Sequence, residues 1–151
     1  MRIVIQKVKS ASVIVEEKKI ASIGKGLLIL VGIENEDLQK DIDHLVKKTI
    51  QLRIFDDENG VMNLSVKDID GDVIVVSQFT LLANTKKGNR PSYIRSAKPN
   101  FSIPMYEKFI MTIENELGKK VGTGEFGAMM NVALVNDGPV TIIIDSKQKD
   151  F

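Results

Sequence analysis

Two uninterrupted apolar runs constrain the fold more than any other feature of this sequence. Residues 26–33 read Gly-Leu-Leu-Ile-Leu-Val-Gly-Ile, and residues 72–76 read Asp-Val-Ile-Val-Val. A strand with one face in water alternates apolar and polar residues, whereas a strand covered on both faces is apolar throughout. Both runs therefore predict buried strands, with other elements packed on each face of their sheet.

Shorter segments complete the predicted strands, at residues 2–8, 12–16, 53–55, 61–64, 130–134 and 140–144. The Asn59-Gly60 pair predicts a hairpin turn, to which it supplies the positive φ angles that such a turn requires. The segment Asn136-Asp137-Gly138-Pro139 predicts a second turn, because Asn, Gly and Pro interrupt regular structure. Both turns would reverse the chain between neighbouring strands.

Two further segments show the apolar spacing of amphipathic helices. The first helix is expected from about Glu36 to Leu52, with Asn35 as its N-terminal cap. The second is expected to open at Ser102 and Pro104 and to end at Gly118, a residue that often terminates helices. Its apolar stripe repeats at Met105, Phe109, Ile113 and Leu117.

The order of these elements predicts an α/β fold. We expect a mixed, largely antiparallel two-sheet core that is barrel-like, with a helix layer on one side, which gives a three-layer β/β/α arrangement. The 151 residues, 43% of them hydrophobic, suffice for one core, so residues 1–151 are expected to form a single domain. No apolar run approaches the length of a membrane span and no signal-peptide core is present, so we expect a cytoplasmic protein without a membrane partner.

Composition narrows the chemistry. The chain has no cysteine and one histidine, His44, which argues against a thiol nucleophile and against a catalytic zinc ion. We therefore expect neither a metal nor another cofactor. His44 falls within the first predicted helix with no Ser or Cys beside it, so we expect it to be solvated or partly packed, and a Ser-His-Asp triad has no support.

Charge predicts at most a local contact with nucleic acid. With 21 Lys plus Arg against 20 Asp plus Glu, the net charge of +1 creates no global field, and we expect no DNA partner. Residues 83–100 read as a long surface loop, and long loops are often functional. Its cations could meet RNA phosphates, although such clusters are commonly plain solvated surface; they are Lys86, Lys87, Arg90, Arg95 and Lys98.

Polar side chains gather where the second buried strand ends. Ser77, Gln78 and Thr80 follow the run at 72–76. A strand-to-loop transition can aim backbone N–H groups at an oxyanion, but Ser and Thr also cap strand ends in many proteins. The residues by themselves leave both interpretations open.

A family resemblance joins these segments. Ser77-Gln78-Phe79-Thr80-Leu81 and the segment 136–141, Asn-Asp-Gly-Pro-Val-Thr, resemble the two signature motifs of the D-aminoacyl-tRNA deacylases. Further segments resemble that family in the same order, at residues 5–8, 11–13, 26–28, 53–55, 62–64, 90–92 and 123–126. The similarity covers nearly the whole chain.

The resemblance implies a homodimer with active sites at the subunit interface. Its reaction would be hydrolysis of the ester between a D-amino acid and the 3′-terminal adenosine of tRNA, for translation quality control. Gly138-Pro139, with a cis peptide bond, would reach into the partner's pocket formed by residues 77–81. There its carbonyl oxygens could accept hydrogen bonds from the α-amino group and its bulk could reject L side chains, while glycine would pass.

The resemblance also implies how the site works. Backbone N–H groups near Phe79 and Thr80 would stabilise the oxyanion, and the 2′-hydroxyl of the adenosine would assist water. Thr80 as a covalent nucleophile is the alternative, although no activating base is evident. Phe126 and Met130 match positions that line the adenine pocket, with core packing as the other interpretation.

Two points stay open at this stage. Lys7 stands where many family members carry an Arg that is thought to brace the Gly-Pro element, and Lys lacks the planar fork of Arg. An RNA-binding dimer without catalysis and an interaction module whose motifs only form an interface are the competing hypotheses.

Overall fold

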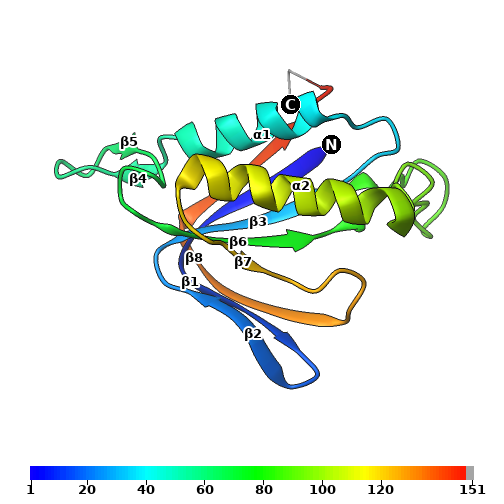
Figure 1. The fold of residues 1–151 in the computed structure, drawn as a ribbon, viewed down its shortest axis with the longest axis horizontal. Helices are drawn as coiled ribbons and strands as arrows, with labels where there is room; N and C mark the ends of the chain where they lie inside the picture. The colour runs from blue at the N-terminus through cyan, green and yellow to red at the C-terminus, as the bar shows by residue number, and fades with distance from the viewer. Residues whose placement is uncertain (149–151) are drawn as a thin grey trace.

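The computed structural model describes residues 1–148 (Figure 1). Its elements in chain order are β1 (Arg2–Val15), β2 (Lys18–Ile23), β3 (Gly26–Gly32), α1 (Gln39–Gln51), β4 (Phe55–Asp56), β5 (Met62–Leu64), β6 (Asp72–Ser77), the 3₁₀ helix η1 (Phe79–Leu82), α2 (Pro99–Leu117), β7 (Gly122–Thr123) and β8 (Met130–Asp145). Within these residues neither α-helix is long and apolar enough to span a membrane.

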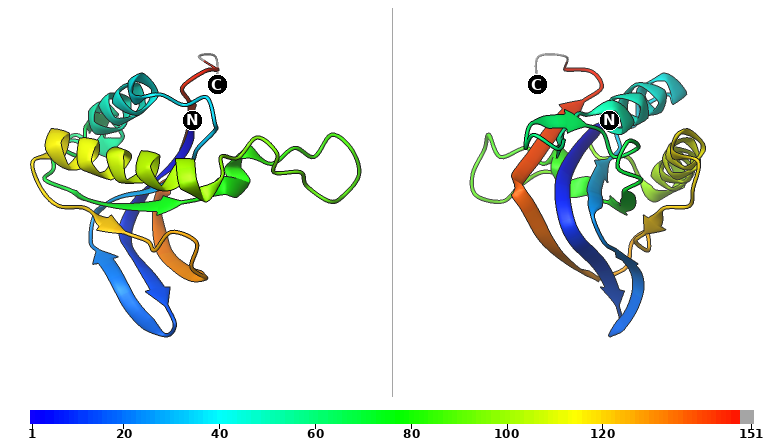
Figure 2. Two further views of the ribbon diagram at one scale, coloured as in Figure 1. Left: turned by 45° about the vertical axis from the view of Figure 1, so that its right-hand side comes forward. Right: turned by 90° about the vertical axis from the view of Figure 1, so that its left-hand side faces the viewer.

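Six strands form one curved sheet. The order is β2-β1-β3-β6-β7, with β8 paired to the other edge of β1. The β3–β6 and β6–β7 pairs are parallel and the others are antiparallel. Strands β1 and β8 curl strongly (Figure 2, right), and β2 comes into contact with β6 and β7, so the sheet is nearly closed. With the small β4–β5 sheet, this confirms the predicted mixed, barrel-like, two-sheet core.

Strands β3 and β6 separate two hydrophobic clusters. Alternate side chains of β3, such as Leu27 and Ile29, join the cluster beneath the helices, whereas Leu28 joins the cluster inside the curl of the sheet. Strand β6 divides in the same way, with Val75 on the helix side and Ile74 inside the curl. Both predicted buried strands are therefore confirmed, and their continuous apolar sequence follows from burial on both faces.

The helices lie side by side on one face of the sheet (Figure 1). The predicted stripe of α2 is confirmed, since all four residues are buried, and Gly118 ends the helix in a left-handed conformation. Helix α2 begins at Pro99, earlier than expected, because proline suits the first helical position. Helix α1 begins later, at Gln39, because Asp41 rather than Asn35 caps it by accepting from the N–H of Leu38, at 2.8 Å.

The expected turn at 136–139 is wrong. Residues 130–145 instead form a single strand, β8, which pairs with β1 on both sides of this segment. The two predicted N-terminal strands, 2–8 and 12–16, are likewise joined in the single strand β1. Val8 faces Asn136 while Gln6 faces Thr141, so the extra residues of β8 form a bulge. The peptide bond between Gly138 and Pro139 within this bulge is cis.

The turn between β4 and β5 also differs from expectation. Gly60 alone adopts a positive φ, +74°, and Asn59 does not. The Asp57 carboxylate accepts from the N–H groups of Asn59 and Val61, at 2.9 and 3.1 Å, and this arrangement needs only one left-handed residue. The hairpin itself is confirmed.

Gly26 allows β3 and β6 to begin side by side. A Cβ atom at this position would lie 1.8 Å from the carbonyl oxygen of Asp72, which belongs to the backbone and cannot swing away. We predict that Gly26→Ala lowers the free energy of unfolding by about 3 kcal/mol or more. Gly24→Ala is the matched control, because nothing lies within 4 Å of its added methyl group. Urea denaturation of both variants checks this, and equal stability would contradict the close approach.

Candidate active site

The polar motif follows the buried strand β6. Ser77 is the last residue of β6, and the N–H of Gln78 donates to the carbonyl of Val31 at the end of the neighbouring β3, at 2.7 Å. The chain then turns at once into η1. The expected position of this motif at the mouth of a buried strand is confirmed.

Two backbone N–H groups point out of this turn without a partner. Phe79 and Thr80 are the first residues of η1, where a helix has no internal acceptor for its N–H groups. In the described part of the chain neither N–H has a hydrogen-bond acceptor. The pair can therefore receive an oxygen atom from a substrate.

The side chain of Thr80 is held by an amide. Gln78 donates from Nε2 to Thr80 Oγ1 in a short hydrogen bond. An amide group takes up no proton near neutral pH, so Gln78 cannot activate this hydroxyl as a general base would. Within residues 1–148 no other side chain bonds to Thr80 Oγ1, and no three His, Cys, Asp or Glu side chains gather closely enough to hold a metal ion.

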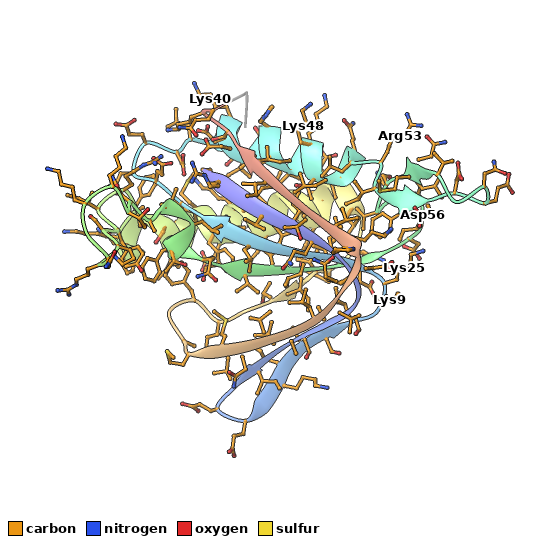
Figure 3. The ribbon with its side chains drawn as sticks, turned by 180° about the vertical axis from the view of Figure 1, so that it is seen from behind. Lys9, Lys25, Lys40, Lys48, Arg53 and Asp56 are labelled. Atoms are coloured by element: carbon orange, nitrogen blue, oxygen red, sulfur yellow. The ribbon has the colours of Figure 1, made fainter. Side chains whose placement is uncertain are left out.

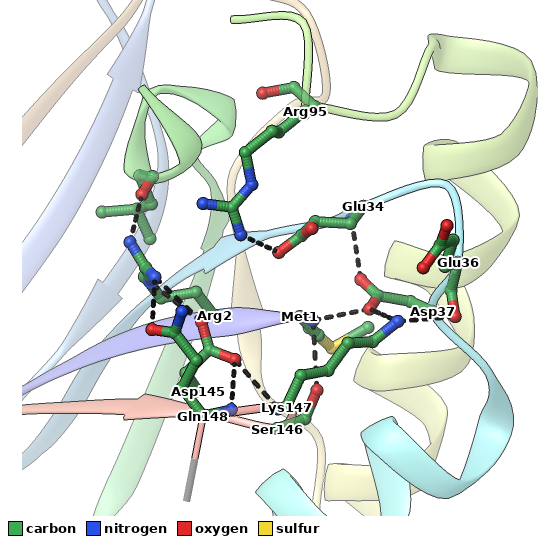
Figure 4. A network of polar contacts seen from close by, with 12 residues as sticks. Met1, Arg2, Glu34, Glu36, Asp37, Arg95, Asp145, Ser146, Lys147 and Gln148 are labelled. Carbon is green, nitrogen blue, oxygen red and sulfur yellow. Dashed lines mark hydrogen bonds and ion pairs between the residues drawn. The ribbon is translucent and has the colours of Figure 1, made fainter. Parts of the chain in front are cut away.

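Arg2 ties the turn to the end of β8. Its Nη1 donates to the carbonyl of Leu81 at 3.2 Å, and its Nε donates to the Asp145 carboxylate at 3.0 Å (Figure 4). Burial alone would raise the pKa of Asp145, but the N–H groups of Lys147 and Gln148 and the Arg2 guanidinium hold this pKa below its ordinary value. The carboxylate therefore stays charged beside Arg2.

A second ion pair joins the start of β1 and the end of β8 to the segment before α1. The amino group of Met1 lies 2.5 Å from the buried carboxylate of Asp37 and 3.1 Å from Ser146 Oγ (Figure 4). Asp37 also accepts from the N–H of Glu34, at 2.7 Å. The start of β1, the end of β8 and the segment before α1 are thus joined near the motif.

Phe126 and Met130 approach the last residues of β6 from the β7–β8 connection. The Phe126 ring packs on Tyr106, 5.9 Å between ring centroids, and Tyr106 donates its hydroxyl to the carbonyl of Val75 at 2.7 Å. A Cβ on Gly124 would lie 2.7 Å from the sulfur of Met130 and 3.5 Å from Val76. Phe126 and Met130 are thus half-buried against the hydrophobic clusters, beside the residues of β6 that precede Ser77.

Gly138 and Pro139 lie elsewhere in the chain. Both are exposed, in the bulge of β8. The register places this bulge beside Val8, which pairs with Gly26, and Gly26 pairs with Asp72 at the start of β6. Ser77 is at the other end of β6, about 16 Å further along. A single chain therefore does not bring Gly138 and Pro139 to the motif at residues 77–81.

Lys7 holds the bulge through charge. Its side chain is 4% exposed, and its Nζ lies 3.9 Å from the carboxylate of Asp137 and 3.6 Å from that of Asp56. It also lies over the Phe55 ring, 5.6 Å from the centroid. Lys7 therefore contacts the residue directly before Gly138 as a point charge, where Arg would offer a planar fork.

The structure also locates His44 and the basic loop. His44 is exposed on α1. The basic loop is confirmed from Ala83 to Lys98, and it projects from the body of the molecule (Figure 2, left). A hollow of about 330 Å³ lies away from the motif, near the end of α1, and is lined by Lys47, Arg53, Ser65, Lys67, Asp68 and Glu116, among others.

Sequence reasoning missed two residues that hold the motif in place. Arg2 bonds to Leu81, and Ser96 donates its hydroxyl to the carbonyl of Phe79 at 2.9 Å. Arg2 stands at the start of an apolar strand, and such a position only weakly indicates that the arginine has a buried partner. Nothing in the sequence indicates the contact of Ser96, because it depends on how the loop folds back.

Comparison with known proteins identifies the family. The sequence profile of the family described as D-Tyr-tRNA(Tyr) deacylase matches residues 4–145. The D-aminoacyl-tRNA deacylase of Flavobacterium johnsoniae is 65% identical over 150 residues, covering 99% of this chain and 100% of the relative. That of Bacteroides thetaiotaomicron is 60% identical with the same coverage. The chain belongs to the D-Tyr-tRNA(Tyr) deacylase family, as the resemblance of its motifs indicated.

Solved structures share the fold. One described as c-Myc DNA Unwinding Element Binding Protein is 39% identical with a TM-score of 0.89, covering 96% of this chain and 98% of that one. Another, from a structural analysis of "a probable eukaryotic D-amino acid tRNA deacylase", is 15% identical with a TM-score of 0.82, covering 95% and 97%. At that identity the second similarity supports the fold alone.

The buried carboxylate of Asp145 makes stability depend on pH. Because its folded-state pKa is lowered, its stabilisation is complete above the unfolded-state pKa of about 4 and is lost as pH falls through the folded-state pKa. We predict that Asp145→Asn is less stable than the wild type by about 1–2 kcal/mol at pH 7, and that this difference shrinks below about pH 3.

Denaturation curves across this pH range measure the effect. Glu58→Gln is the control, since Glu58 is exposed and no cation of the described residues lies within 4.0 Å of its carboxylate. A difference for Asp145→Asn that stays constant down to pH 2 would show that the charge of Asp145 is not what stabilises the chain.

Proposed function

We propose that this chain is a D-aminoacyl-tRNA deacylase, which hydrolyses the ester between a D-amino acid and the 3′-terminal adenosine of tRNA. The observation that carries the proposal is the pair of unpartnered N–H groups of Phe79 and Thr80 at the end of β6, within the family motif. Membership of the family supports the same substrate. The site needs no metal or other cofactor in this proposal, and we infer a cytoplasmic location from the proposed tRNA substrate.

Hydrolysis of this ester does not require a strong base from a side chain. An aminoacyl ester is already activated, so the enzyme has to position water and stabilise the tetrahedral oxyanion. The N–H groups of Phe79 and Thr80 donate to that oxyanion, and the adenosine 2′-hydroxyl assists the attacking water. A nucleophilic Thr80 is disfavoured, because the partner of its hydroxyl is the Gln78 amide. Gln78 holds the turn through its backbone N–H and its side-chain amide, and Ser77 precedes it as the last residue of β6.

Chiral selection requires a second copy of the chain in this proposal. Gly138 and Pro139 are exposed at the far end of β6 from the motif, so they can reach a motif only in a partner. Strand β8 pairs only with β1 among the described strands, and its outer face exposes Val135 by 51% and Ile143 by 42%. An open edge with apolar side chains is suited to a subunit interface.

In the dimer the Gly138-Pro139 element closes the partner's site. Its carbonyl oxygens accept from the α-amino group of the substrate, which makes recognition independent of the side chain. An L side chain would clash with the element, whereas a D side chain points outward and glycine passes. A 10,000-fold preference for D over L requires about 5.5 kcal/mol in the transition state. The Lys7 contact with Asp137 supports a rigid element.

Phe126 and Met130 complete the adenosine side of the site in this proposal. They lie against the end of β6 next to the motif, where a ring and a thioether offer contact to a base. Both hydrophobic clusters share one sheet, so we infer that residues 1–151 act as one domain. Removal of misacylated tRNA, including glycine on the wrong tRNA, would be a step of translation quality control.

Hydrolysis of D-Tyr-tRNA and L-Tyr-tRNA, measured side by side against enzyme-free controls, tests the proposal. We expect rapid loss of the D ester only, unchanged by excess EDTA. Light scattering of the same preparation should give twice the chain mass of 16.8 kDa. If neither ester is cut faster than its control, a binding function replaces the enzyme. A monomer that still rejects the L ester would contradict the cross-subunit element.

Replacement of Thr80 separates the two mechanisms. We predict that Thr80→Ala keeps kcat within about tenfold of the wild type, because its backbone N–H remains. Thermal stability measured in parallel confirms that the variant is folded. A loss of activity of about 10,000-fold in a folded variant would instead assign the nucleophile to the Thr80 hydroxyl.

A further inference from the structure

Positive charge is segregated in one segment of the chain. Residues 83–100 contain five Lys or Arg and no Asp or Glu. The rest of the chain then holds 16 of the 21 cationic residues against all 20 acidic ones, which leaves it a net charge of −4. The small net charge of the whole chain, +1, is therefore the sum of a basic segment and an acidic remainder.

The basic residues stand on an ordered arm, defined here as residues 84–92. Asn84 and Ser92 exchange two backbone hydrogen bonds, of 2.8 and 2.9 Å, which close its base. The Asn84 side chain also accepts from the N–H of Lys86, at 2.9 Å. The arm projects from the body of the molecule (Figure 2, left).

Its three cations have no internal role within the described residues. Lys86, Lys87 and Arg90 are exposed, and no carboxylate there lies within 4.0 Å of them. Arg95, just beyond the arm, differs in that it pairs with Glu34 at 3.0 Å. The arm thus presents three exposed charges that are free to contact another molecule.

The arm is connected directly to the candidate site. Tyr93 packs edge-to-face on Phe79, 5.0 Å between ring centroids, and both rings are partly exposed. Ser96 holds the Phe79 carbonyl, as described above. Exposed aromatic rings beside a cationic strip are the combination that binds single-stranded nucleic acid, through base stacking and phosphate contacts.

We propose that the arm binds the phosphates of the nucleotides that precede the terminal adenosine of tRNA, through Lys86, Lys87 and Arg90. This inference rests on the proposed function, which places the ester at Phe79 and Thr80. Tyr93 contacts Phe79 and directly follows the arm in the chain, so it offers the single-stranded RNA a path from that ester to the three cations. Because the rest of the chain carries a net negative charge, the arm would supply most of the electrostatic attraction for the RNA.

Binding of an uncharged RNA hairpin with a 3′ CCA end tests the arm without any reaction. Loss of each phosphate contact to a single strand lowers the slope of log affinity against log salt by about 0.7. The triple variant Lys86→Ala, Lys87→Ala, Arg90→Ala should therefore bind at least about tenfold more weakly at low salt, with a slope reduced by about 2.

The control variant removes the same number of positive charges from α1. Lys40, Lys47 and Lys48 are exposed there, and Lys40 and Lys48 point outward from that helix (Figure 3). Replacing all three by alanine should weaken binding by less than about threefold, through the general field alone. Equal losses in the two triple variants would overturn the proposal.

Turnover gives a second readout. We expect the arm variant to lower the ratio of kcat/KM on D-Tyr-tRNA to that on 3′-O-(D-tyrosyl)adenosine, which has no phosphate, by about tenfold or more. An unchanged ratio would contradict phosphate binding by the arm. If the wild type cuts neither ester, the proposed function fails, and the hairpin measurement still decides whether the arm binds RNA.

Discussion

Burial of both faces of β3 and β6 governs where every other element can lie. Side chains of one parity, such as Ile29 and Val75, need the helices as a cover, and those of the other parity, such as Leu28 and Ile74, need the curl of β1, β2 and β8. Each element therefore covers one face of the same strand pair. The close approach at Gly26 lets the pair begin in register, and Ser77 is where it ends.

The end of this pair creates the candidate site. Once β6 leaves the sheet at Ser77, backbone groups that the ladder would satisfy become free, and η1 turns two N–H groups outward. Arg2 and Ser96 hold two carbonyls of that turn, so its geometry depends on contacts from the start of β1 and from the loop before α2. A rigid backbone donor pair of this kind suits an oxyanion, because it needs no reorganisation during the reaction.

The two family motifs lie at opposite ends of β6. The motif lies at one end, and the bulge with Gly138 and Pro139 lies at the other, held by Lys7. A site that uses both ends can form only between two copies of the chain. The basic arm lies at the motif end, so that the proposed RNA and the proposed partner chain would meet at the same place.

The sequence by itself determined the two buried strands, the apolar stripe of α2, the β4–β5 hairpin and the position of the motif after β6. Those features follow from local periodicity and turn chemistry. Only the tertiary structure decided that residues 136–139 continue a strand, because their pairing partner is the distant β1, and a turn and a bulge have the same local sequence signals. The contacts of Arg2, Lys7 and Ser96 were likewise decided by long-range packing, since each joins residues that only the folded sheet brings together.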